Sequence, residues 1–94
     1  MTGSLRIDYQ ATKTTGNNVK ADAGEFKALL QSIHSQNESL KQHWQGGDAD
    51  SYTKKISEQE QVMNKLQSSM EEIGDYLIKV AGAYQQAMED NKIS

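Results

Sequence analysis

The chain has 94 residues, of which 24% are charged, and carries a net charge of −3 with neither Cys nor Pro. Without Cys there is no disulfide and no Cys-based metal site, and the charges are too mixed to form the dense basic cluster of a nucleic-acid-binding protein. No apolar run reaches the roughly 18 residues of a membrane span, and the first ten residues lack the apolar core of a signal peptide. The length predicts one domain, residues 1–94.

Apolar residues in the first half recur at steps of four and three, the spacing that keeps one side of a helix against a partner. The positions are Leu5, Tyr9, Thr12, Gly16, Val19, Ala23, Phe26, Leu30, Ile33, Asn37, Leu40 and Trp44. They predict a helix over about 8–44, with Asp8 as its N-cap. Thr12 and Gly16 are weak helix formers at core positions, so this stretch is either a thin part of the helix or a place of close approach by another chain.

The centre of the chain carries Trp44, the only Trp, followed by Gln45 and Gly46. A Gly just past a helix end commonly takes a left-handed conformation, so Gly46 and Gly47 are expected to end the first helix. The turn is predicted over 45–48, and Asp48 or Asp50 is expected to cap the second helix.

The second half repeats the spacing and predicts a helix over about 49–90, followed by a short polar tail. Its positions are Tyr52, Ile56, Gln59, Met63, Leu66, Met70, Ile73, Leu77, Val80, Tyr84, Ala87 and Asn91. If Leu30 and Ile56 are called heptad position a, further apolar residues stand at position g and widen the apolar face. These are Leu29, Val62, Tyr76 and Ala83.

A wide apolar face suits a bundle better than an isolated helix pair, and a small chain needs the extra burial. The predicted fold is therefore all-α: an antiparallel two-helix hairpin that dimerises into an elongated four-helix bundle. The residues assigned to core and dimer packing are Val19, Phe26, Leu30, Ile33, Leu40, Met63, Leu66, Met70, Ile73, Leu77 and Val80. The polar members Asn37 and Gln59 either fix register and partner or lie at a wet edge.

The side chains offer no site for chemistry. His34 and Glu38 share a helix face, but one His and one carboxylate are too few to hold a metal. No catalytic motif is present, so we expect no enzymatic activity, no cofactor and no metal. Mild acidity and the lack of a basic face also argue against membrane insertion.

A chain of this length, with two helices and Trp44-Gln45-Gly46 at the central turn, resembles the WXG-motif family of small type VII (ESX) secretion proteins, of the early-secreted-antigen type. The resemblance implies a homodimer, or a heterodimer with a paired WXG-type protein, held in the cytoplasm and then secreted folded by a membrane-embedded ATPase without a cleaved signal peptide. The predicted function is a non-enzymatic secretion substrate. The alternative is a cytoplasmic chaperone-like targeting partner for a large toxin with a helical export domain.

The family's export signal, Tyr-X-X-X-Asp/Glu, is matched only approximately. Tyr84 is followed four residues later by Met88, and Glu89 stands one place further. Tyr84 and Glu89 are therefore the candidate export signal, with a signal borrowed from a partner chain as the alternative.

Overall fold

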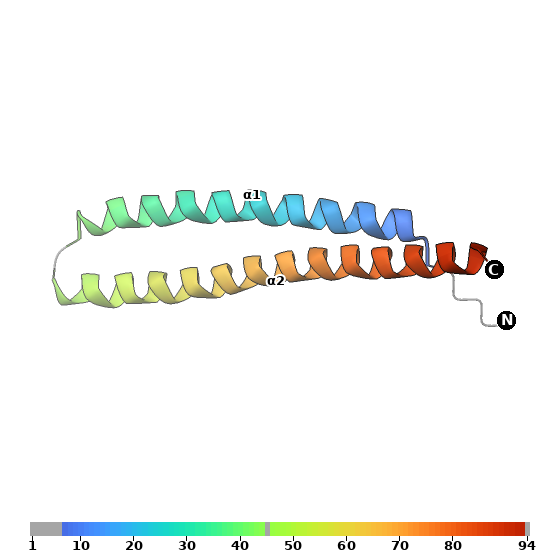
Figure 1. The fold of residues 1–94 in the computed structure, drawn as a ribbon. Coiled ribbons are helices and arrows are strands. Elements are labelled where there is room, and N and C mark those ends of the chain that lie inside the picture. The colour runs from blue at the N-terminus through green and yellow to red at the C-terminus, as the bar shows by residue number, and fades with distance from the viewer. Residues whose placement is uncertain (1–6, 45, 94) are drawn as a thin grey trace. The chain divides into compact units, whose positions relative to one another are not determined.

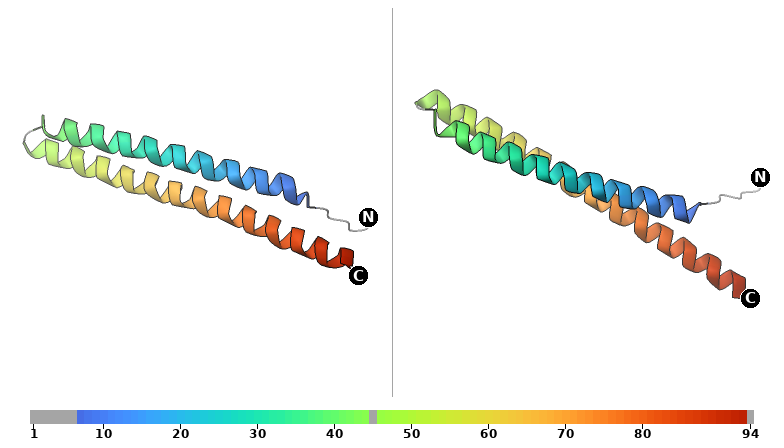
Figure 2. Two further views of the ribbon diagram at one scale, coloured as in Figure 1. Left: turned by 45° about the horizontal axis from the view of Figure 1, so that its top comes forward. Right: turned by 90° about the horizontal axis from the view of Figure 1, so that it is seen from above.

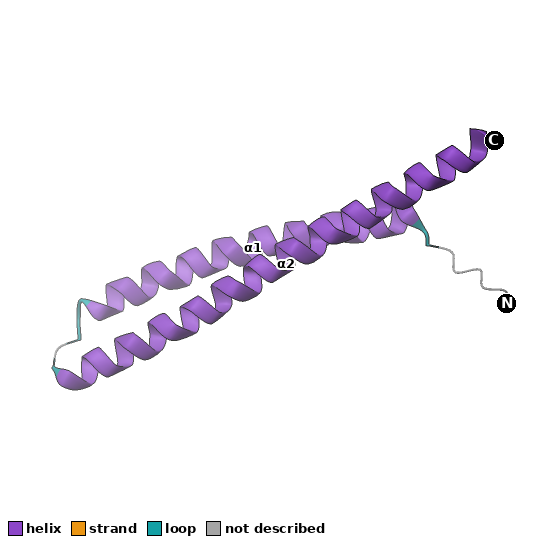
Figure 3. Cartoon of the chain, turned by 60° about the horizontal axis from the view of Figure 1, so that its bottom comes forward, coloured by secondary structure: helices purple, strands orange, loops and turns teal. Residues whose placement is uncertain are grey.

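The computed structural model describes residues 7–44 and 46–93, which form two helices, α1 (Tyr9–Lys41) and α2 (Gly47–Ile93), and no strand (Figures 1 and 3). The all-α fold and the helical hairpin are confirmed. Residue contacts divide the chain into two units. We call Met1–Ala21 with Met70–Ser94 the terminal unit, and Asp22–Ser69 the turn unit. In each unit a segment of α1 runs antiparallel to a segment of α2 (Figure 2).

Asp8 caps α1 as predicted. Its Oδ1 accepts the backbone N–H of Ala11 at 3.0 Å, and its carbonyl accepts that of Thr12 at 2.9 Å. These bonds satisfy N–H groups that no earlier turn of helix can reach, so the helix begins at the next residue, Tyr9.

The connection between the helices differs from the expectation in its boundaries. α1 ends at Lys41, because the N–H groups of Gln42, His43 and Trp44 bond three residues back, at 3.3, 2.9 and 3.2 Å, and tighten the chain into a narrower turn. Gly46 has a φ of 100°, as expected for a glycine at a chain reversal.

The second helix starts earlier than predicted, at Gly47, because the Gly46 carbonyl already accepts the Ala49 N–H at 3.1 Å. The predicted side-chain cap was therefore wrong: Asp48 and Asp50 lie within the first turn, where their charge favours the positive end of the helix dipole. α2 also runs on to Ile93, beyond the expected end near residue 90, since neither Gly nor Pro occurs between residues 90 and 93.

In the turn unit, one small, one large apolar and one polar residue are buried between the helices. Ala23 is fully buried and Leu30 is 7% exposed. Opposite them, the buried Gln67 donates its side-chain N–H to the Ala23 carbonyl at 3.4 Å. This bond satisfies a polar group that would be costly to bury alone.

In the terminal unit the helices approach backbone to backbone. A Cβ at Gly16 would stand 3.0 Å from the Gly74 carbonyl oxygen and 2.8 Å from Ile78 Cγ1, while one at Gly74 would stand 3.0 Å from the Gly16 oxygen. Only glycine permits this separation. The weak helix former at position 16 therefore marks a close approach, as one of the two readings held, but the approaching helix belongs to the same chain.

The predicted contact positions are correct for most of α1, whereas on α2 the contact with α1 lies partly at another heptad position. On α1 the described members from Tyr9 to Asn37 are buried or half-buried; Leu40 is exposed, and Leu5 lies outside the described residues. On α2 position a is half-buried from Ile56 to Tyr84, but Gln59, Leu66 and Ile73 at position d are exposed. Position e faces α1 instead, with Glu60 half-buried and Gln67, Gly74 and Ala81 buried. The apolar pattern missed this because position e carries polar or small side chains.

Candidate interaction surface

The most distinctive surface of α2 is a column of exposed apolar side chains. Leu66 and Ile73 at position d are 54% and 53% exposed, and Val62 and Tyr76 at position g are 59% and 66% exposed. Because d and g lie on one side of a helix, about 60° apart, Val62 and Leu66 share a face of α2 in the turn unit, and Ile73 and Tyr76 share one in the terminal unit. We call Val62, Leu66, Ile73 and Tyr76 the α2 stripe.

Helix α1 has fewer exposed apolar side chains, at the same heptad positions. Leu29 at g is 55% exposed and Leu40 at d is 41% exposed, with half-buried Phe26 and Ile33 beside them. Scattered exposed apolar residues need no explanation, but side chains repeated at fixed heptad positions mark a helix face that lacks a partner.

The predicted packing residues therefore fall into two groups. Leu30 is buried; Val19, Phe26, Ile33, Met63, Met70, Leu77 and Val80 are half-buried within the chain. Leu40, Leu66 and Ile73 are exposed and contribute little to the packing of a single chain. Their assignment to dimer packing stays a prediction, and the single chain leaves them free for that purpose.

At the turn, Trp44 is half-buried and packs edge-on against Tyr52, with ring centroids 5.9 Å apart and planes at 66°. The two rings line a shallow hollow together with His43, Asp48 and Ala49. Positive φ at Gly46 turns the chain so that the first turns of α2 return to Trp44. Trp44 and Gly46 thus act together to shape the end of the hairpin.

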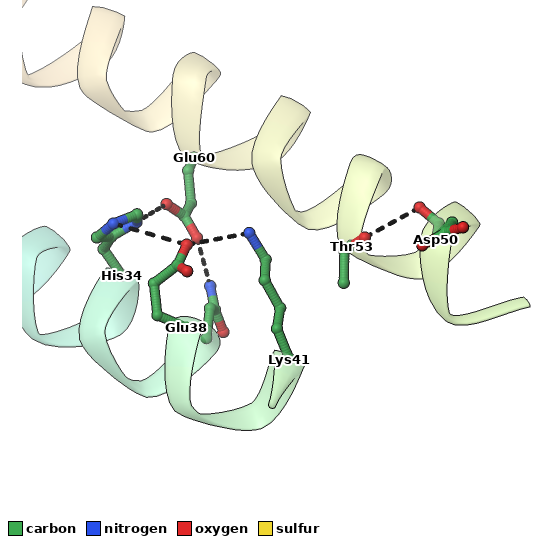
Figure 4. A network of polar contacts seen from close by, with 7 residues as sticks. His34, Glu38, Lys41, Asp50, Thr53 and Glu60 are labelled. Atoms are coloured by element: carbon green, nitrogen blue, oxygen red, sulfur yellow. Dashed lines mark hydrogen bonds and ion pairs between the residues drawn. The ribbon is translucent and has the colours of Figure 1, made fainter. Parts of the chain in front are cut away.

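Polar side chains connect α1 and α2 in the turn unit (Figure 4). Glu60 accepts from Asn37 Nδ2 at 2.6 Å and lies 2.6 Å from His34 Nδ1, so a single carboxylate bridges α1 and α2. Glu38 pairs with Lys41 at 3.0 Å and lies 3.8 Å from His34 Nε2. We call His34, Asn37 and Glu60 the polar bridge.

The bridge favours the charged carboxylate. The hydrogen bonds from Asn37 and then from His34 hold the pKa of Glu60 below its ordinary value of 4.5. Asn37 and Gln59 are predicted either to fix register and partner or to lie at a wet edge. Asn37 is half-buried in a cross-helix hydrogen bond, whereas Gln59 is exposed. No group of three metal-ligating side chains occurs in the described part of the chain.

The sequence also contains a regular spacing of basic residues that the apolar pattern does not reveal. The basic residues of α1 stand seven residues apart, at Lys13, Lys20, Lys27, His34 and Lys41. All occupy position e, which borders α2 on the polar side. In the terminal unit Lys20 pairs with Asp75 at 2.7 Å, which raises the pKa of this exposed lysine. In the turn unit Lys27 and His34 line a groove of about 620 Å³ together with Gln31, Gln61 and Asn64.

The two candidate export residues do not share a surface. Tyr84 is half-buried and lines a hollow with Tyr9 and Met88, while Glu89 is exposed and accepts from Gln85 at 3.4 Å. Five residues of helix separate their directions by about 140°. The structure therefore does not bring Tyr84 and Glu89 together, and the export role of both stays a prediction.

Neither helix has an apolar stretch long enough to cross a membrane within the described residues. Searches of curated proteins and of solved structures gave no match. A family model described as "Proteins of 100 residues with WXG" matches residues 4–88, which is most of the chain and includes both helices and the turn. With Trp44 and Gly46 shaping that turn, the chain belongs to the WXG100 family, the small WXG proteins of type VII secretion.

Proposed function

We propose that this protein is a non-enzymatic type VII secretion substrate, exported as a folded helical dimer from the cytoplasm. Proteins of its family pair as dimers. The observation that carries the proposal is the unpartnered apolar face: positions d and g of both helices hold large side chains that are about half exposed in the single chain. A second hairpin on this face completes a four-helix bundle.

Recognition by the secretion ATPase is assigned to the end of α2. Glu89 and Asp90 are both exposed, and each accepts a hydrogen bond from a glutamine on its own helix, at 3.4 and 3.2 Å. A partner protein can therefore reach either carboxylate without disturbing the packing of the hairpin. Tyr84, which is half-buried, contributes to recognition through the packing of this helix end.

The dimer is tested with Ile73→Asp, which places a charge within the α2 stripe. The substitution leaves the single hairpin intact because Ile73 is already 53% exposed. It should abolish the dimer seen by light scattering and block secretion from a bacterium with a type VII system. Ser68→Asp, an exposed position f on the same helix, is the matched control and should change neither.

The export signal is tested separately, in the same secretion assay, with Glu89→Ala against Asp90→Ala. We expect loss of export for the first and normal export for the second, with the dimer unchanged in both. Retention of the wild-type protein inside the cell, together with its requirement for export of a large toxin, would instead establish the targeting-partner role.

A further inference from the structure

We infer that the hollow at the turn, bordered by Trp44, Tyr52 and Asp48, holds an arginine side chain presented by a partner protein. The inference goes beyond the proposed function, because none of these residues belongs to the α2 stripe or to the candidate export signal. Tyr52 stands ten residues before Val62, the first residue of the stripe, which is roughly 15 Å along the helix. Every residue that lines the hollow belongs to the turn unit.

The two aromatic rings leave open surface on which a cation can bind. Trp44 and Tyr52 meet edge-on, with planes at 66°, so neither ring covers the face of the other completely. Tyr52 is 61% exposed, although its ring would be stabilised by burial. The face of an aromatic ring is electron-rich and attracts a positive charge, most strongly for Trp. The ring pair therefore favours a cationic ligand over an anionic one.

The charges around the hollow have the sign that a cation requires. Asp48 lines the hollow, Asp50 follows two residues later, and residues 42–53 contain no Lys or Arg. The ion pairs found within the described residues involve neither acid. The start of α2 contributes about half a positive charge from its dipole, which is less than the two full negative charges of these carboxylates. The charge of Asp48 is therefore available to a partner.

Among cations, an arginine matches this arrangement best. Its planar guanidinium can stack on an aromatic face and donate N–H groups to a carboxylate at the same time, which the ammonium of lysine cannot do. Here ring faces and a carboxylate border one hollow of about 400 Å³. The hollow is shallow, so it suits a side chain laid across it better than a small molecule that must be enclosed.

The same chemistry points to a protein as the source of the cation. Trp, Tyr and Arg are the residues that contribute most often to the energetic centre of a protein–protein interface. The turn of this chain supplies a half-buried Trp44 and an exposed Tyr52, and lacks the third member. A partner that presents an arginine completes the set.

Trp44 reports on the hollow directly, because it is the only Trp of the chain. Its fluorescence is followed while the full chain is titrated with acetyl-Gly-Arg-Gly-amide, or with the matched peptides that carry citrulline or leucine instead of arginine. We expect a saturable change with the arginine peptide and binding at least about five-fold weaker with the other two. Citrulline keeps the shape of arginine and removes its charge. Equal binding of the citrulline or leucine peptide would overturn the inference, as would a signal that does not saturate below about 10 mM.

The role of the carboxylate is tested with Asp48→Asn, which keeps the side-chain shape and removes the charge. The dissociation constant of the arginine peptide should rise about ten-fold, and that of the citrulline peptide should not change. Asp50→Asn is the matched control: it makes the same change of charge in the same helical turn, at an exposed residue that is not among those lining the hollow. It should change binding less than about two-fold. Equal losses from the two variants would show that only net charge matters, and the assigned contact would be wrong.

The role of the second ring is tested with Tyr52→Leu, which leaves Trp44 in place as the reporter. Arginine binding should weaken about five-fold. Circular dichroism should show unchanged helix content, since the Tyr52 side chain is mostly exposed. Unaltered binding by this variant would remove Tyr52 from the site and refute the ring pair as its basis. Dimerisation and export, which test the proposed function, are measured separately and can succeed or fail independently of this site.

Discussion

The two units hold their helices together by opposite means. In the terminal unit, Gly16 and Gly74 let the backbones approach until a Cβ would stand about 3.0 Å from a carbonyl oxygen. In the turn unit, Gln67, Asn37 and Glu60 span the space with side-chain hydrogen bonds, and a polar groove remains open beside them. One unit thus depends on the absence of side chains, and the other on their hydrogen bonds.

This difference predicts different sensitivities to mutation. Close backbone packing cannot relax without moving a helix, so adding atoms there is costly. A polar bridge open to water on one side can rehydrate when a partner is lost, so its removal costs less.

The largest loss is expected from Gly16→Val. Its side chain meets the Gly74 carbonyl and Ile78, so the free energy of unfolding should fall by about 3 kcal/mol. Denaturant unfolding measures this change. Gly82→Val, in the same unit but with nothing within 4 Å of an added Cβ, should lie within about 0.5 kcal/mol of wild type. Equal effects of the two substitutions would contradict the close approach.

A smaller loss is expected when the polar bridge is cut. Glu60→Ala leaves Asn37 without its acceptor and removes the partner of His34, which should cost about 1–2 kcal/mol. Glu38→Ala removes an exposed carboxylate from the same cluster and should cost under about 0.5 kcal/mol. If both variants unfold at the same denaturant concentration, Glu60 does not bridge the helices.

At the turn, Gly46→Ala should destabilise the protein by about 1 kcal/mol. Nothing lies within 4 Å of the added Cβ, so the penalty comes only from the positive φ of 100°. Gly47→Ala, one residue on and already helical, should be neutral or slightly stabilising. A thermal melt of the two variants decides between this explanation and a general intolerance of the turn to substitution.

The smallest effect is one of pH. Because the folded state lowers the pKa of Glu60, this group stabilises the fold above 4.5, and its contribution is lost as pH falls through the depressed folded value. Glu60→Gln does not titrate. The difference in unfolding free energy between wild type and Glu60→Gln should therefore be constant at neutral pH and shrink on acidification below 4.5. A difference that does not change with pH would show that the charge is not involved.

The sequence by itself determined the two helices, the cap at Asp8, the glycine turn after Trp44 and the family. These depend on local chemistry: helical apolar spacing, a side chain that accepts an N–H three residues on, and a conformation that glycine tolerates. The sequence also supplied the wide apolar face, since Leu29, Val62 and Tyr76 stand beside the main repeat and are exposed.

The tertiary structure decided which side of α2 faces α1. Apolar spacing favours positions a and d, but positions a and e make the contact, because glycine, alanine and hydrogen-bonded Gln67 and Glu60 allow or bridge a close approach. A pattern that counts only large apolar residues does not detect such contacts. By taking the small and polar residues inward, the hairpin leaves Leu66 and Ile73 on the outside, where a partner can bury them.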